Sequence, residues 1–340
     1  MNGGKNFREL TFSRNVFIPV TSFCRNRCGY CGFRRDRGWV MEMEEIISLG
    51  EKAVSFGCSE ALITLGERAD VHPEVRITLE NFGFSTMVDY LEHVCKELLK
   101  IGLLPHTNAG LLNEEEMRRL KRWNASMGLM LETAAIVPSH AKSPGKDPEK
   151  RLKMIETAGK LKIPFTTGIL VGIGETRKDR FQSILKLREI NWKFGHIQEI
   201  IIQPFAPKAG TPMATTPPPS LEEIVEIISF TKIVMPGVSV QIPPNLLWEG
   251  DGSEGLQLAV LSGADDLGGI SPVTPDFINP EHPWPEISRL KRVVAEAGCR
   301  LRERLPVYPR LVKSKGYLSP EVMKVVRRLA DEDGFRNEWS

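Results

Sequence analysis

The sequence predicts an α/β fold: a closed (βα)8 barrel of the TIM type, complete or nearly complete, with extra helices after it. Two observations predict this. Short apolar runs alternate with amphipathic segments along all 340 residues, a pattern typical of a parallel sheet covered by helices. Eight strand–helix units fit into roughly 260 residues, which suits a barrel of this type. A doubly wound open sheet is the alternative architecture.

The apolar runs place the eight strands in order. They are expected over residues 15–20, 60–65, 103–107, 125–131, 163–172, 197–203, 238–242 and 263–267. Helices are expected between them over residues 41–56, 85–101, 113–123, 147 onward, 178–190, 220–235 and 254–261.

Capping signals fix several helix starts. Asn113 with Glu116 forms a capping box, and Ser220 opens a second one. Asp147 followed by Pro148 is a cap residue with proline at the first helical position. The chain therefore divides into an N-terminal tail (1–14), the barrel (15–275) and a C-terminal helical extension (276–340), with helices expected over 284–298 and 319–332.

Composition excludes several classes of partner. The formal net charge is +2 and the basic residues are spread along the chain, so no footprint for nucleic acid or an anionic membrane is indicated. There is no apolar run long enough to span a bilayer and no apolar signal region at the start. We expect a cytoplasmic protein whose thiols stay reduced, with Cys58, Cys95 and Cys299 acting as small buried hydrophobes.

Three cysteines crowd into the segment after the first strand. Cys24, Cys28 and Cys31 have the spacing CxxxCxxC. A closed zinc site uses four ligands and disulfides use pairs, so three cysteines fit neither. Thiolates favour iron–sulfur clusters, where three ligands leave one iron open. A zinc site with a distant fourth ligand is the alternative.

The cysteine motif, with Tyr30 just before its last member, resembles that of the radical S-adenosylmethionine (SAM) superfamily. The resemblance implies one 4Fe-4S cluster held by Cys24, Cys28 and Cys31. It also implies S-adenosyl-L-methionine, whose amino and carboxylate groups chelate the open iron. In that superfamily one electron cleaves the cofactor to methionine and a 5′-deoxyadenosyl radical.

Further positions match the superfamily and are implied to contact SAM. Gly66–Glu67 stands where its members receive the methionine amino group. Glu132, and Arg151 19 residues later, resemble the pair that holds the ribose and the carboxylate. The string GILVGIGE around Gly172 and Ile173 is similar to the fifth-strand pattern that borders the adenine; alone, its glycines also suit a tight turn.

Longer strings narrow the resemblance. SRNVFIPVTSFCRNRCGYCGFRRD, IIQPFAPKAGTPM and GADDLGGISPVTPDFINPEHPWP are similar to the CofG-type subunit of FO synthase (7,8-didemethyl-8-hydroxy-5-deazariboflavin synthase), and the similarity runs from about residue 11 to residue 305. It implies a carbon–nitrogen lyase of deazaflavin coenzyme biosynthesis. Such an enzyme closes the ring of a hydroxybenzyl-ribityluracil adduct made by a CofH-type partner enzyme, releases ammonia, and takes electrons from a donor such as ferredoxin or flavodoxin.

A ribityl chain and a uracil ring call for neutral or acidic hydrogen-bonding groups at the carboxyl ends of the strands. The substrate candidates at those ends are Asn108, Thr133, Thr167, Gln203, Gln241 and Asn245; about half of such residues are expected to cap or satisfy turns instead. Asp265 and Asp266 are the favoured catalytic pair, because two acids beside a short apolar strand are costly unless something binds them. His106, His140 or one of these acids is the expected general base.

Three competing functions stay open. The partner radical SAM enzyme, which joins tyrosine to 5-amino-6-(D-ribitylamino)uracil, meets the same ribityl-uracil. A biotin-synthase-like sulfur inserter needs ligands for a second cluster, which the scattered Cys58, Cys95 and Cys299 do not supply. A non-catalytic zinc protein is the third.

Overall fold

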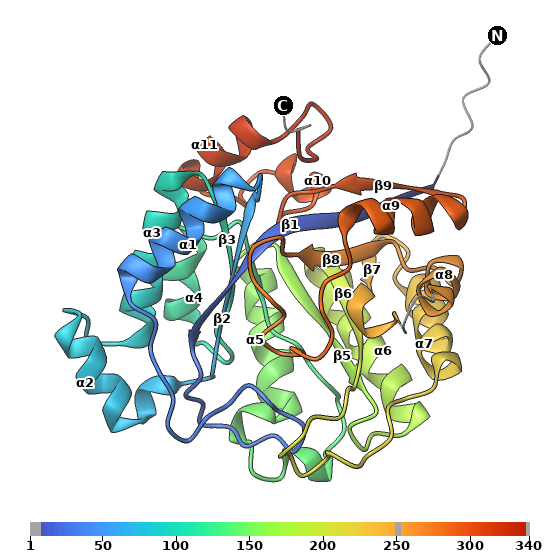
Figure 1. Ribbon diagram of the computed structural model, residues 1–340, viewed down its shortest axis with the longest axis horizontal. Coiled ribbons are helices and arrows are strands. Elements are labelled where there is room, and N and C mark those ends of the chain that lie inside the picture. The colour runs from blue at the N-terminus through green and yellow to red at the C-terminus, as the bar shows by residue number, and fades with distance from the viewer. Residues whose placement is uncertain (1–7, 249–252, 338–340) are drawn as a thin grey trace.

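The computed structural model describes residues 8–248 and 253–337, and within them a closed barrel of eight parallel strands forms the centre (Figure 1). Neighbours in the sheet follow chain order, and β1 pairs with both β2 and β8, which closes the ring. The strands are β1 (Arg8–Thr21), β2 (Glu60–Leu65), β3 (Leu104–Asn108), β4 (Ser126–Gly128), β5 (Phe165–Val171), β6 (Ile197–Pro204), β7 (Ser239–Gln241) and β8 (Asp266–Ile270). The predicted (βα)8 barrel is confirmed, and the open sheet is wrong.

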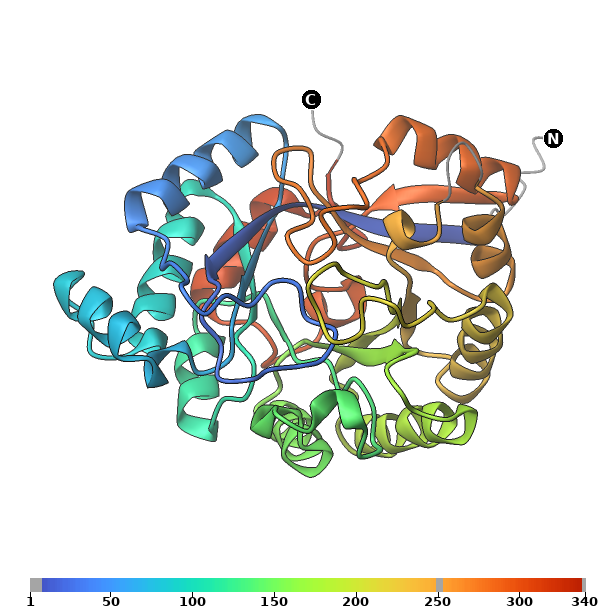
Figure 2. The same cartoon turned by 60° about the horizontal axis from the view of Figure 1, so that its bottom comes forward.

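The helices surround the ring of strands (Figure 2). They are α1 (Met43–Ser55), α2 (Pro73–Asn81), α3 (Met87–Ile101), α4 (Glu114–Lys121), α5 (Pro148–Lys160), α6 (Arg177–Phe194), α7 (Leu221–Val234), α8 (Glu254–Leu261), α9 (Ile287–Glu296), α10 (Pro309–Val312) and α11 (Pro320–Leu329). Each predicted cap is present: Asn113 and Ser220 form capping boxes, and Asp147 accepts two backbone N–H groups. The short α2 was not predicted.

The first strand starts earlier than expected. β1 begins at Arg8, and its residues 8–12 pair with a ninth strand, β9 (Cys299–Glu303). Leu10 and Phe12 are buried there. The expected N-terminal tail over residues 1–14 is therefore wrong for residues 8–14, and the extension after residue 275 is not purely helical. Sequence reading missed the pairing because the two segments lie almost 300 residues apart.

The last barrel strand starts later than expected. Gly263, with φ of 121°, ends α8 in a left-handed conformation, and β8 begins only at Asp266, not at residue 263. Gly268 and Gly269 lie inside β8, where glycine weakens the strand signal. As a result, Asp265 and Asp266 lie at the amino end of the strand.

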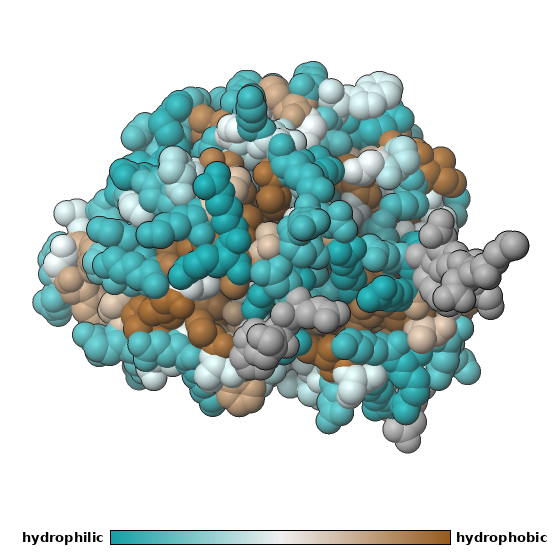
Figure 3. Space-filling view, turned by 90° about the horizontal axis from the view of Figure 1, so that it is seen from above, coloured by the Kyte–Doolittle hydropathy of each residue, from teal (hydrophilic) through white to brown (hydrophobic). Residues whose placement is uncertain are grey.

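The C-terminal segment covers the amino end of the barrel. Leu305 and Val307 pack with Leu104 and Ala125, which lie at the starts of β3 and β4, and with residues of α11. Hydrophilic side chains predominate on this face, with separate hydrophobic groups between them (Figure 3). Among the described helices, none has both the length and the apolar character needed to cross a membrane.

Candidate active site

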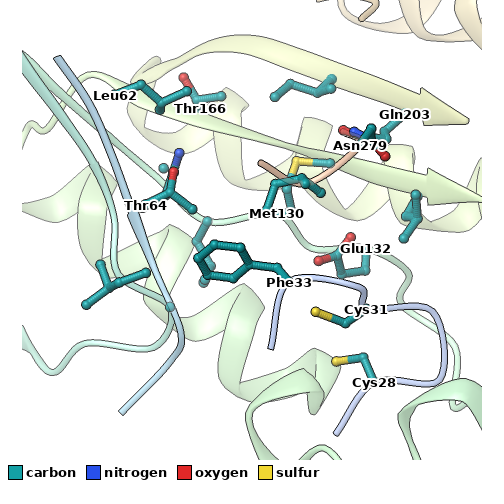
Figure 4. Close-up of a pocket in the computed structure, with 18 of the residues that line it drawn as sticks. Cys28, Cys31, Phe33, Leu62, Thr64, Met130, Glu132, Thr166, Gln203 and Asn279 are labelled. Carbon is teal, nitrogen blue, oxygen red and sulfur yellow. The ribbon is translucent and has the colours of Figure 1, made fainter. Parts of the chain in front are cut away.

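A cavity of about 380 Å³ lies inside the barrel and reaches the cysteine loop. Figure 4 shows Cys28 and Cys31 on one side of it with Glu132 beside them, and Leu62 and Thr166 farther from the sulfur atoms. The loop that follows β1 lies across the mouth of the barrel in Figure 2. The cavity therefore lies where barrels carry their chemistry, at the carboxyl ends of the strands.

The three predicted metal ligands share this cavity. Cys24, Cys28 and Cys31 are free thiols, partly exposed, and all line it. Burial raises the pKa of the Cys24 thiol to about 11. The thiol is therefore protonated in the absence of a metal, and a metal that binds there displaces the proton, because the thiolate is the ligand.

Neighbouring loops hold the cysteine loop in place. Gly29 N donates to Ser139 O (2.8 Å), and Gly145 N donates to Asn26 Oδ1 (2.8 Å). Ser143 Oγ donates to Cys28 Sγ (3.3 Å). These contacts come from the segment of short 3-10 turns between β4 and α5. The thiols are thereby positioned before any ligand arrives.

The donor chemistry fits an iron–sulfur cluster, because three thiolates on one loop are soft ligands. Within residues 8–248 and 253–337, no group of three or more His, Cys, Asp or Glu side chains is arranged to hold a single metal ion. The fit therefore rests on the thiol set and on the shared cavity.

Gly66 and Glu67 directly follow β2 and pack against the cysteine loop. A Cβ at Gly66 would overlap the carbonyl oxygen of Phe23, so only glycine fits. The Glu67 carboxylate accepts from Arg25 (2.8 Å) and from the backbone N–H of Leu111 (3.1 Å). Burial alone would raise the pKa of Glu67, but Arg151 and Arg25 outweigh it and lower the pKa, so the group is ionised.

Glu132 and Arg151 meet near the same loop. Glu132 follows β4 with φ of 65° and is ion-paired with Lys146. Arg151 donates to Met130 O (2.6 Å) and Gly145 O (2.8 Å), and lies 4.0 Å from Glu132 and 3.5 Å from Glu67. Burial opposes ionisation of Glu132, but Lys146 and Arg151 lower its pKa. Three of the predicted cofactor residues, Glu67, Glu132 and Arg151, are thus together, and Lys146 is an addition to the set.

Tyr30 also lines the cavity, and its hydroxyl lies 3.0 Å from His140 Nε2. Gly172 and Ile173 do not line it. Their backbone N–H groups donate to the Glu175 carboxylate (2.8 Å each), and Gly172 has φ of 99°. Those two positions form a tight strand-to-helix turn.

Half of the predicted substrate residues line the cavity: Asn108, Gln203 and Gln241. The others do not. Thr133 Oγ1 accepts from Ala135 N, Thr167 is buried outside the cavity lining, and Asn245 donates to Asp276 and to His282 O (3.0 Å each). Those three expected positions in the site are wrong, because side chains alternate between the two faces of a strand and residues of the loops turn back to satisfy their own backbone.

The favoured acid pair lies outside the cavity lining as well. Asp265 is ion-paired with Lys232, and Asp266 accepts from Arg304 Nε (2.6 Å). Both stand at the amino end of β8, so the expected catalytic position is wrong. His106 does line the cavity, and its Nδ1 lies 2.6 Å from Ser126 Oγ. Burial lowers the pKa of His106 to about 4, which keeps the ring neutral.

Sequence reasoning missed the groups at the deep end of the cavity. Glu60 and Glu199 line it from β2 and β6, and Arg304 reaches it from the C-terminal segment. The alternation Glu60, Leu62, Thr64 could have placed Glu60 inside the barrel. The sequence around Arg304 carries no pattern that predicts its place in the cavity, because that place depends on the pairing of β9 with β1.

The chain is similar to a known superfamily and to known proteins. Residues 18–187 match the model of the radical SAM superfamily. The 7,8-didemethyl-8-hydroxy-5-deazariboflavin synthase of Methanothermobacter thermautotrophicus is 51% identical over 326 residues, covering 94% of this chain and 98% of that protein. The synthase of the same name from Archaeoglobus fulgidus is 51% identical over 328 residues, covering 96% and 98%.

Solved structures share the fold. Methylornithine synthase (PylB) aligns with a TM-score of 0.63 at 19% identity, covering 86% of this chain and 83% of that one. The FeFe-hydrogenase maturase HydG from Carboxydothermus hydrogenoformans aligns with a TM-score of 0.68 at 16% identity, covering 96% and 76%. At these identities the likeness concerns the fold alone.

Proposed function

This chain belongs to the radical SAM superfamily and, within it, to the family of 7,8-didemethyl-8-hydroxy-5-deazariboflavin (FO) synthases, and from that premise we propose that it is the subunit that closes the deazaflavin ring. Its substrate in this proposal is the adduct 5-amino-5-(4-hydroxybenzyl)-6-(D-ribitylimino)-5,6-dihydrouracil. The products are FO, ammonia, methionine and 5′-deoxyadenosine. The protein is then a carbon–nitrogen lyase.

One observation carries the proposal: a single cavity joins three cysteine thiols at the barrel mouth to amide, carboxyl and basic side chains along its walls, which include the amides of Asn108, Gln203 and Gln241. Such walls suit an uncharged, hydroxyl-rich substrate. The depth of the cavity removes the substrate from bulk water, which protects reactive species from side reactions.

Cys24, Cys28 and Cys31 would hold a 4Fe-4S cluster, and S-adenosyl-L-methionine would bind beside it. When bound, this pair supplies the one-electron cleavage that starts the radical reaction. Glu67 and Glu132 are ionised and suit an ammonium group and ribose hydroxyls, while the planar guanidinium of Arg151 suits a carboxylate. Tyr30, which lines the cavity beside them, completes the proposed cofactor contacts.

The walls of the cavity would orient the adduct. Asn108, Gln203 and Gln241 each carry an amide that both donates and accepts, as the imide edge of a uracil requires. A pKa of about 4 makes His106 a poor base at neutral pH, so we assign it a hydrogen-bonding role. Its Nδ1 is engaged by Ser126, which fixes the orientation of the ring.

The proposal implies two protein partners. A CofH-type enzyme supplies the adduct, and a ferredoxin or flavodoxin supplies electrons. Both meet this chain in the cytoplasm, where thiols stay reduced.

The test separates ring closure from the partner reaction. The chain is reconstituted with iron and sulfide without oxygen, then given reductant and SAM with either the adduct or tyrosine plus 5-amino-6-(D-ribitylamino)uracil. We expect fluorescent FO from the adduct and no adduct from the second mixture. Adduct formation from tyrosine would instead assign the chain to the partner reaction.

Cysteine variants test the metal assignment. Cys28→Ser should abolish 5′-deoxyadenosine formation, whereas Cys299→Ser, at a buried cysteine on β9 that does not line the cavity, should retain it. Metal analysis should find iron and sulfide in the proportion of a 4Fe-4S cluster. One zinc per chain and a colourless protein would refute the assignment.

A further inference from the structure

The interior of this barrel holds a cavity with several polar and charged side chains, where barrels are usually filled with branched apolar ones. The cavity descends from the cysteine loop to Glu60, the first residue of β2, and to Glu199 on β6. Resting on the proposed function, we infer that this deep end binds the ribityl chain of the substrate through its hydroxyl groups and rejects a chain that ends in a phosphate.

Two glycines make room for polar side chains here. Gly128 on β4 and Gly269 on β8 both line the cavity. A Cβ at Gly128 would overlap the Asn108 amide oxygen, and a Cβ at Gly269 would overlap the Asn15 amide nitrogen. Larger residues at these positions would displace the two amides. The sequence therefore keeps the interior both hollow and hydrogen-bonding.

The side-chain amide of Asn15 is buried without hydrogen-bond partners. Asn15 is 1% exposed, and neither its amide nitrogen nor its amide oxygen has a partner among the described residues. Buried amides are almost always satisfied, so such an orphan needs an explanation. Asn15 is not itself a lining residue, but it lies two residues before the lining residue Phe17 on β1 and its amide packs behind the lining residue Gly269. A hydroxyl both donates and accepts, so one hydroxyl of a polyol that reaches past Gly269 can pair with either atom of this amide.

The charges at the deep end favour a ligand that donates hydrogen bonds. Glu60 is buried, and burial raises its pKa to about 7. Glu199 pairs with Arg304 (3.0 Å) and accepts from Thr166 Oγ1 (2.6 Å). Asp266 pairs with the same Arg304. Two carboxylates therefore share the guanidinium of Arg304, and the carboxyl group of Glu60 adds a third acid near them. Ligand hydroxyls that donate hydrogen bonds are favoured there, and a phosphate dianion is repelled.

The length of the cavity sets how the substrate is oriented along the barrel axis. β2 advances about 3.3 Å per residue, so Glu60 and Gly66 lie roughly 20 Å apart along the strand. With its chain at Glu60 and Asn15, the substrate presents its hydroxybenzyl and uracil rings toward the cysteine loop. In Figure 4, Leu62 and Thr166 lie on the side of the cavity away from Cys28 and Cys31.

Three chromophores test the inference with the reconstituted protein: FO itself, the same deazaflavin with a methyl group in place of the ribityl chain, and FO phosphorylated at the end of that chain. Equilibrium dialysis with fluorescence detection gives each dissociation constant. A hydrogen bond to a charged group is worth about tenfold in affinity. We expect FO to bind at least tenfold more tightly than the other two.

Single-residue variants show which side chains make FO bind more tightly than the methyl analogue. Asn15→Ala and Glu60→Gln should each reduce the preference for FO over the methyl analogue about fivefold or more. Neither variant should unfold the protein. The Asn15 side chain has no hydrogen-bond partner among the described residues that its removal could break, and Glu60→Gln removes a carboxyl group that is costly to ionise when buried. Thr167→Val is the control, because the Thr167 hydroxyl also lacks a partner among the described residues but its side chain points to the opposite face of β5 from that of the cavity-lining Thr166.

Three results would overturn the inference. FO and the methyl analogue could bind equally to the wild type, the phosphorylated chain could bind as tightly as FO, or both variants could keep the full preference. If any of these accompanies FO synthesis from the adduct, the inference fails while the proposed function stands. If the wild type makes no FO from the adduct, the proposed function fails and the inference falls with it.

Discussion

At the scale of single residues, Gly66 shows how closely β2 and the cysteine loop fit. A Cβ at this position would overlap a backbone oxygen of the loop rather than a flexible side chain, so Gly66→Ala should displace the loop and the thiols on it. We expect a large loss of bound iron after reconstitution, measured by metal analysis. Gly237→Ala is the control, because a Cβ there meets nothing within 4 Å. Equal iron content in the two variants would contradict this fit.

Glu60 should give folding stability a distinct pH dependence. Its pKa rises from 4.5 to about 7 on burial. Below pH 4.5 it is protonated in both states; between 4.5 and 7 the folded state binds the proton more tightly, so the unfolding free energy falls as pH rises through this window. The loss is about 3 kcal/mol and stays constant above pH 7.

Glu60→Gln removes this dependence. The unfolding free energy of the variant minus that of the wild type should therefore rise by about 3 kcal/mol between pH 4 and pH 8. Denaturant titrations of the metal-free protein at several pH values measure it. A difference that stays flat with pH would show that Glu60 is not buried as described.

Some site residues could be predicted from the sequence and some could not. The cysteine spacing and its resemblance brought Glu67, Glu132 and Arg151 to one site, because motif residues carry their own signal. Asp265 and Asp266 were misplaced by a strand boundary only a few residues off. Sequence cannot fix such boundaries, since they depend on pairing with neighbouring strands.

At the scale of elements, caps decide where helices begin. The Asn113 side chain accepts from Glu116 N (2.9 Å) at the start of α4. Asn113→Ala should lower stability by about 1 kcal/mol, seen as a lower denaturant midpoint and faster amide exchange in the first turn of α4. Lys153→Ala, on the exposed face of α5, should change stability by less than about 0.5 kcal/mol. An unchanged first turn in the Asn113 variant would contradict the cap.

Elements with periodic apolar residues and caps were predicted well, and glycine-rich or distant ones were not. α4, α5 and α7 begin at the expected residues because their N-caps are local. The start of β8 was misplaced because Gly268 and Gly269 weaken its sequence signal. β9 was not predicted because it is defined by its pairing with β1. Tertiary pairing overrides local propensity in both.

At the scale of the whole molecule, Arg304 ties the C-terminal segment to the barrel. It is buried and donates to Asp266 and Glu199. Arg304→Met leaves two buried carboxylates without their cation, which should cost about 3–5 kcal/mol. Arg302→Met, at a partly exposed ion pair with Glu9 and Asp331, should cost less than about 1 kcal/mol. Denaturant unfolding compares them, and equal losses would contradict this central role.

The barrel as a whole was predictable because eight alternating units leave few arrangements. The polar side chains inside the barrel were not predictable, because which face of a strand points inward depends on register. The packing of the C-terminal segment against the amino end of the barrel was also not predictable, because it depends on contacts between residues far apart in the sequence, such as Leu104 and Leu305.

A crystal structure of the reconstituted protein, grown without oxygen with SAM and the adduct, tests the central claim most directly. We predict a 4Fe-4S cluster on Cys24, Cys28 and Cys31, the adduct inside the barrel, its rings facing the cluster and its ribityl chain at Glu60 and Asn15. A single zinc ion on the cysteines, or an adduct bound outside the barrel, would contradict the account.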